Sequence, residues 1–141
     1  TYFQQVIILK NFMNKILAEV SVGELFDKIS ILEIKKDKIK DKEKLKYILD
    51  EYNLLKEQMV NKVKLDEKLS GLFDTLKDIN SKLWVIEDDK RLCEKNSDFG
   101  EKFIKLSRDI HFLNDKRASI KLEINNQTGS KIKEIKEYTS Y

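Results

Sequence analysis

The residues best suited to chemistry lie in two stretches, 84–91 and 108–121, in which charged side chains recur at helical spacing. The first stretch carries adjacent carboxylates and the second carries guanidinium groups. If both stretches are antiparallel helices that fold back near residue 97, positions whose numbers sum to about 194 lie level, because the two helices rise equally per residue. We therefore predict a polar groove, formed by Trp84, Glu87, Asp88, Arg91, Arg108, His111, Asn114, Asp115, Arg117 and Lys121.

Two interpretations fit this set of charges. The arginines could clamp an anionic or phosphorylated metabolite, with Glu87, Asp88 or Asp115 as an acid, a base or a metal ligand. Alternatively, opposite charges on the facing helices form salt bridges that fix the register of the helix pair. We favour the salt bridges, because a helical surface of this charge density forms such pairs readily.

Long cations interrupt the apolar stripes of two predicted helices at Lys90 and Arg117. A cation at such a position must either reach water or find an acid. Polar residues in a heptad core commonly set partner choice and register. Specific helix pairing is therefore the favoured explanation, and a buried cation that receives an anionic ligand is the alternative.

Metal and cofactor chemistry find little support in the sequence. Asp98-Phe99-Gly100 spells the metal-binding motif of protein kinases, but the glycine-rich and catalytic-loop motifs that accompany it are absent. A di-iron helical site needs Glu-x-x-His, whereas Arg108 stands three positions before His111. One histidine and one cysteine, Cys93, cannot make a zinc site. We therefore expect no metal and no cofactor.

The composition indicates long helices with exposed, charged faces. Charged residues make up 38% and hydrophobic residues 40% of the chain, and proline is absent; such helices bury one narrow stripe each. The 28 basic and 25 acidic residues alternate, whereas a nucleic-acid binder clusters unmatched cations. We expect no nucleic-acid partner. The lone cysteine and the lack of a run of about 20 apolar residues favour a cytoplasmic protein without a membrane span.

Apolar residues at alternating steps of three and four predict four helices. The predicted segments are 21–40, 45–63, 69–93 and 99–124. Short connections make successive helices antiparallel neighbours. We expect an all-α fold, an antiparallel helical hairpin or bundle of three to four helices with coiled-coil-like heptad packing. A second apolar edge on the helices predicts a homodimer.

Capping residues mark the expected helix ends. Ser21 opens the first helix with a capping box, Asp41 caps the second, and Asp98 starts the fourth in a similar box. Gly129 ends the fourth helix, since glycine readily adopts the left-handed conformation.

The chain divides into three parts by pattern. We expect residues 1–13 to be a non-native or disordered lead, because a regular pattern begins only after Met13. Residues 14–129 form a single helical domain. Residues 130–141 form a charged C-terminal tail that docks on the bundle.

Several motifs occur in a fixed order along residues 14–141. They are Val20–Lys35, Leu83-Trp84, Ile86-Glu87-Asp88, Arg91, Asp98-Phe99-Gly100, Asn114-Asp115, Arg117-Ala118, Lys121 and Ile124-Asn125, with a closing Tyr141. Their order and spacing resemble an uncharacterised bacterial family of short, all-helical proteins, a domain of unknown function. The resemblance implies no catalytic or binding residue.

Two functional hypotheses follow. The first is a non-enzymatic protein-interaction or scaffold module that self-associates through its helical seams. The second is a small all-α enzyme or binding protein for an anionic or phosphorylated metabolite. An interaction module pairs its charged groups internally or exposes them to solvent, whereas an enzyme gathers them in a concave pocket with shifted pKa values.

Overall fold

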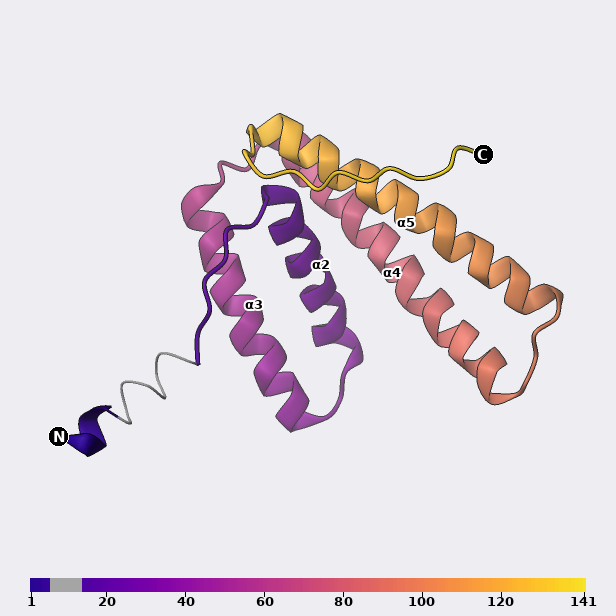
Figure 1. Cartoon of the computed structure of the whole chain (residues 1–141), viewed down its shortest axis with the longest axis horizontal. Coiled ribbons are helices and arrows are strands. Elements are labelled where there is room, and N and C mark those ends of the chain that lie inside the picture. Colours follow the sequence, from indigo (N-terminus) through magenta and orange to yellow (C-terminus); the bar gives the residue numbers. More distant parts are fainter. Residues whose placement is uncertain (6–13) are drawn as a thin grey trace.

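Four long helices make up most of the computed structural model, which describes residues 1–5 and 14–141 (Figure 1). They are α2 (Val22–Lys38), α3 (Lys42–Lys62), α4 (Glu67–Lys95) and α5 (Glu101–Thr128). No strand occurs in the described part of the chain, and the predicted all-α class is confirmed. The expectation for the lead falls largely on residues 6–13, which lie outside the described residues.

The helices form two antiparallel hairpins, α2 with α3 and α4 with α5 (Figure 1). Helix α2 contacts all three others, so it joins the hairpins. The hairpins meet where α2 and α4 begin and where α3 and α5 end, and they diverge toward their connecting turns (Figure 1). The distal half of the α4–α5 hairpin therefore extends away from α2 and α3.

The hydrophobic core lies at the end where the hairpins meet. Each helix contributes to it: the buried members are Phe26, Ile29, Met59, Leu69, Leu76 and Ile124. Phe26 also packs edge-on against Phe73, with ring centroids 5.8 Å apart. Full burial of side chains of this size stabilises the fold by about 1.5–3 kcal/mol each. Most of the packing energy is thus concentrated beside the first turns of α2.

Three of the predicted helix ends are confirmed. The Ser21 hydroxyl accepts a hydrogen bond from the Glu24 amide at 3.1 Å, and the Asp41 carboxylate accepts one from the Lys44 amide at 2.9 Å. Gly129 ends α5 with φ of 65°. Ser21 and Gly129 therefore fix the start of α2 and the end of α5, which both border the site described below.

The predicted start of α5 at Asp98 is wrong. Gly100 is the N-cap and makes no side-chain capping bond. Asp98 instead completes the C-terminal turn of α4: its amide donates to the Cys93 carbonyl at 2.9 Å, and Ser97 adopts a φ of 53°. This six-to-one bond is the closing bond of a Schellman motif. The Asp98 backbone thus closes the end of α4, while its carboxylate accepts a hydrogen bond from the Gly100 amide at 3.2 Å and caps no amide of α5.

Candidate functional site

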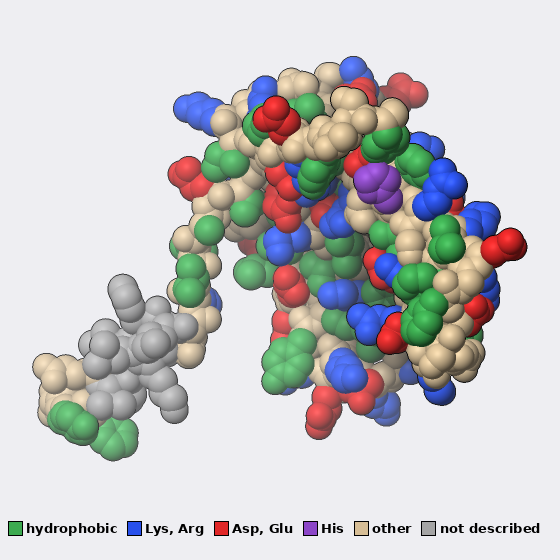
Figure 2. All heavy atoms as spheres, turned by 45° about the vertical axis from the view of Figure 1, so that its right-hand side comes forward, with side chains coloured by type: hydrophobic (Ala, Val, Ile, Leu, Met, Phe, Trp, Pro, Cys, Tyr) green, Lys and Arg blue, Asp and Glu red, His purple; other side chains and the backbone are tan. Residues whose placement is uncertain are grey.

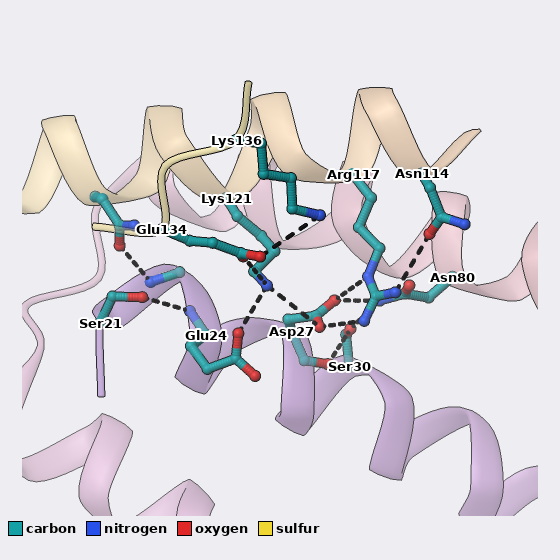
Figure 3. A network of polar contacts seen from close by, with 12 residues as sticks. Ser21, Glu24, Asp27, Ser30, Asn80, Asn114, Arg117, Lys121, Glu134 and Lys136 are labelled. Atoms are coloured by element: carbon teal, nitrogen blue, oxygen red, sulfur yellow. Dashed lines mark hydrogen bonds and ion pairs between the residues drawn. The ribbon is translucent and has the colours of Figure 1, made fainter. Parts of the chain in front are cut away.

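Asp27, in the second turn of α2, is the centre of a polar network that joins three helices (Figure 3). The residue is only 2% exposed. Arg117 on α5 donates two hydrogen bonds to its carboxylate, from Nε to Oδ1 at 2.9 Å and from a terminal nitrogen to Oδ2 at 2.5 Å. Asn80 on α4 donates a third to Oδ1 at 2.9 Å. A paired guanidinium–carboxylate contact of this kind is both strong and directional.

The surroundings of Asp27 keep it ionised. Burial alone would raise the pKa of this carboxyl, but hydrogen bonds from Arg117 and Asn80 and the charges of Arg117 and Lys121 hold its pKa below the ordinary value. In turn, the hydrogen bonds to Asp27 raise the pKa of Arg117. Both groups are charged throughout the physiological range.

Ser30 completes the buried part of the network. Its hydroxyl accepts a hydrogen bond from the Asn80 side-chain amide at 2.8 Å and donates to the Asp27 carbonyl at 2.8 Å. Among the described residues, no buried side-chain nitrogen or oxygen lacks a hydrogen-bond partner. A fully satisfied network costs little to bury and holds one arrangement of the helices.

Lys121, one turn after Arg117 on α5, is the second cation of the network and is only 8% exposed. Its Nζ atom lies 2.7 Å from Glu24, 3.1 Å from Glu134 and 3.9 Å from Asp27. Burial alone would lower the pKa of Lys121, but its hydrogen bonds to Glu24 and Glu134 raise it. Lys121 is therefore a charged ammonium shared by three carboxylates.

Helices α2 and α5 approach each other very closely at Gly23. A Cβ atom on this residue would lie 2.5 Å from the Lys121 carbonyl oxygen, which no larger residue could tolerate without movement of the backbone. The Gly23 amide donates to the Asn125 side-chain oxygen at 2.7 Å. This bond satisfies one of the unpaired amides of the first turn of α2.

The C-terminal segment, residues 130–141, runs back along α5 (Figure 1). Glu134 reaches Lys121 and also lies 3.5 Å from the Nζ atom of Lys136 (Figure 3). At the far end, the Tyr141 hydroxyl bonds to Asp115, a contact that raises the pKa of Tyr141. These contacts agree with a tail that docks on the helices.

Two adjoining cavities lie between α5 and this segment. The larger, of about 230 Å³, is lined by Ala118, Ser119, Lys121, Leu122, Asn125, Glu134 and Lys136. The smaller, of about 160 Å³, is lined by Asn114, Arg117, Ala118, Lys121, Glu134 and Lys136. Both cavities therefore border Lys121, and the smaller one also borders Arg117.

Part of the predicted groove takes part in this network. Arg117 and Lys121 are in it, and Asn114 accepts a hydrogen bond from Arg117 at 3.4 Å. A cation at the position of Arg117 is expected to find an acid or reach water, and the acid is Asp27 on a different hairpin.

The other predicted groove residues lie nearer the turn that connects α4 and α5. Glu87, Asp88, Arg91, Arg108 and His111 are exposed, while Trp84 and Asp115 are half-buried. Among the described residues, Arg108 forms no ion pair with Glu87 or Asp88 of α4.

Arg108, His111 and Lys90 lie against aromatic rings of α5 and of the C-terminal segment. Arg108 lies over Phe112, 5.9 Å from the ring centroid, and the rings of His111 and Tyr141 are 5.2 Å apart. Lys90 lies over the ring of Phe103 at 5.2 Å, close to the register expected for the two helices. The groove residues are thus divided between the Asp27 network and an exposed stretch beyond it.

Six polar residues of the network were not predicted as site residues: Glu24, Asp27, Ser30, Asn80, Asn125 and Glu134. A signal for four of them was present, because Glu24, Asp27, Ser30 and Asn125 belong to the motifs that carry the family resemblance. Asn80 and Glu134 belong to none of these motifs. Their partners become evident only when the packing of the helices and the tail is known.

Within the described residues, no helix combines the length and the apolar character needed to span a membrane. No group of three or more histidine, cysteine or acidic side chains there is arranged to hold a metal ion.

A search of curated proteins and a search of solved structures each found no significant match. A scan against protein families matched residues 16–141 to DUF6165, a family of unknown function. The chain belongs to this family of unknown function.

Proposed function

We propose that this chain is a non-enzymatic interaction module that self-associates through its exposed helical surfaces in the cytoplasm. One observation supports this function above the others: the charged residues predicted to form a catalytic or binding groove are either paired internally or exposed to solvent. Arg117 and Lys121 are paired with acids, and Glu87, Asp88 and Arg91 are exposed on α4. That division is the one expected of an interaction module.

The paired charges have a positioning role in this proposal. They hold α5 against α2, so the α4–α5 hairpin projects from the core at a fixed angle. Buried polar contacts of this type often specify one arrangement among several. A rigid projecting hairpin presents the same surface to every partner.

The distal half of the α4–α5 hairpin is the proposed contact surface. Its exposed large hydrophobic side chains are Val85, Leu92, Phe99, Ile104 and Phe112, each 40–55% exposed. Val85 and Leu92 are seven residues apart and share one face of α4. Such heptad spacing suits the seam of a coiled-coil-like contact with a second copy. Figure 2 shows hydrophobic side chains interspersed with both signs of charge on the visible face.

The experiment is a measurement of mass in solution by analytical ultracentrifugation. We expect the wild-type chain to be a dimer and the double variant Val85→Lys/Leu92→Lys to be a monomer. The matched control is Tyr47→Lys/Leu54→Lys, which places the same charges at the same spacing on exposed positions of α3. This control should remain a dimer. A wild-type chain that stays monomeric at every concentration contradicts the proposal.

A second candidate function is the binding of an anionic metabolite. It is favoured by the cavities between α5 and the C-terminal segment, which border Arg117, Lys121 and Lys136. Arg117 and Lys121 belong to the groove predicted from the sequence, and Lys136 adds a third cation from the tail.

A further inference from the structure

We propose that the larger cavity between α5 and the C-terminal segment binds a small carboxylate, whose anionic group takes the place of Glu134. This inference rests on the second candidate function and specifies its ligand. It is independent of self-association, because the cavity lies on α5 beside the C-terminal segment and not on the proposed contact surface.

Of the three acids around Lys121, Glu134 is the one that can leave. Glu24 and Asp27 are held in helix α2. Glu134 lies in an irregular segment beyond the end of α5, and its side chain is 48% exposed. The cation, by contrast, is fixed: the Lys121 side chain is 11% exposed and lies 2.7 Å from Glu24. Departure of Glu134 would leave a positioned ammonium group at the wall of the cavity.

The balance of charge favours a monoanion as the ligand. Arg117, Lys121 and Lys136 carry three positive charges, and Asp27 and Glu24 carry two negative ones. With Glu134 displaced, one positive charge is unmatched, and a carboxylate restores neutrality. A phosphate dianion would leave an excess negative charge beside two carboxylates, which is unfavourable in a partly buried site.

The walls of the cavity suit a short aliphatic chain. Ala118 and Leu122 form an apolar side, and Ser119 and Asn125 add polar groups. The volume is about 230 Å³, and a protein cavity of about 150 Å³ is enough to hold benzene. A four-carbon carboxylate therefore fits, with its carboxylate at Lys121 and its chain against Leu122.

The test is a titration of the full chain with butyrate, followed by the backbone amide shifts of residues 118–122. Glu134→Gln removes the internal competitor. We expect this variant to bind butyrate about threefold to sixfold more tightly than the wild type, since a half-exposed ion pair competes only modestly. The matched control is Glu137→Gln in the same segment, because Glu137 forms no ion pair among the described residues. It should bind like the wild type.

Further ligands and a second variant separate the possible failures. Butyramide, which lacks the charge, should not shift the same amides, and Lys136→Met should weaken binding of butyrate to Glu134→Gln. Equal affinity of Glu134→Gln and wild type for butyrate overturns the inference. Binding of inorganic phosphate without binding of butyrate overturns the carboxylate assignment and leaves the second candidate function standing. No saturable binding of either anion to Glu134→Gln overturns both.

Discussion

Replacing Arg117 with methionine tests whether the Asp27 network fixes the two hairpins against each other. The substitution leaves the Asp27 carboxylate, with a side chain 3% exposed, facing Asn80 and the more distant Lys121. Removing one partner of a buried ion pair typically costs about 3–5 kcal/mol. Because 29% of the Arg117 side chain is exposed, solvent screens part of this cost, and we expect a loss of about 2–3 kcal/mol in the free energy of unfolding.

The assay is urea-induced unfolding at neutral pH, followed by far-ultraviolet circular dichroism. Asp27→Leu and the double variant Asp27→Leu/Arg117→Met complete a double-mutant cycle. The double variant should lose less stability than the sum of the two single variants, by about 1–3 kcal/mol, since it leaves no unpaired buried charge. Arg108→Met is the control, because Arg108 is exposed and its replacement should change stability by about 0.5 kcal/mol or less. Additive single effects, or an Arg117→Met variant as stable as the control, would refute the reasoning.

Three further predictions concern the same junction of α2 and α5. Gly23→Ala should lower the free energy of unfolding by about 1–3 kcal/mol, because the added Cβ meets the Lys121 carbonyl. Gly71→Ala is the control: its new Cβ in α4 meets nothing within 4 Å, so it should raise the free energy of unfolding by about 0.5–1 kcal/mol. The urea midpoints of the two variants distinguish these outcomes. The pKa of Asp27 is lowered in the folded chain, so its ionisation contributes stability that is complete above the unfolded pKa of about 3.9 and is lost as pH falls through the folded pKa. Urea midpoints measured at decreasing pH should therefore fall less steeply for Asp27→Asn than for the wild type. Ser21→Ala should cost about 1 kcal/mol through loss of the cap of α2, and thermal unfolding that matches the wild type would contradict the role of this cap.

The local features of the fold could be predicted from the sequence, because each depends on residues close together in the chain. The caps at Ser21, Asp41 and Gly129 follow from side-chain chemistry within a few residues. The four helices follow from apolar spacing. Asp98 was misassigned because two helix ends compete for the same few residues, and spacing alone does not show which end uses them.

The partners of the charged residues were harder to predict. Arg117 was identified as a stripe position that needs an acid or water, but the acids of the predicted groove all lay on α4 and α5. The actual partner, Asp27, is 90 residues away in sequence. Helical periodicity gives the face on which a side chain lies, and it does not give the helix that will cover that face. Heptad packing and self-association remain predictions for the same reason.

The location of the buried charges has a physical logic. A short turn already fixes the register of α4 against α5, and another fixes α2 against α3, so a salt-bridge ladder within either hairpin would add little. No short connection fixes α2 against α4 and α5. In the described part of the chain, the ion pairs between helices occur at this junction: Arg117 pairs with Asp27, and Lys77 lies 2.9 Å from Glu33. Because hydrophobic contacts are non-directional, directional bonds are needed where the chain itself supplies no register. The network therefore determines how the α4–α5 hairpin projects, on which the proposed interaction surface depends.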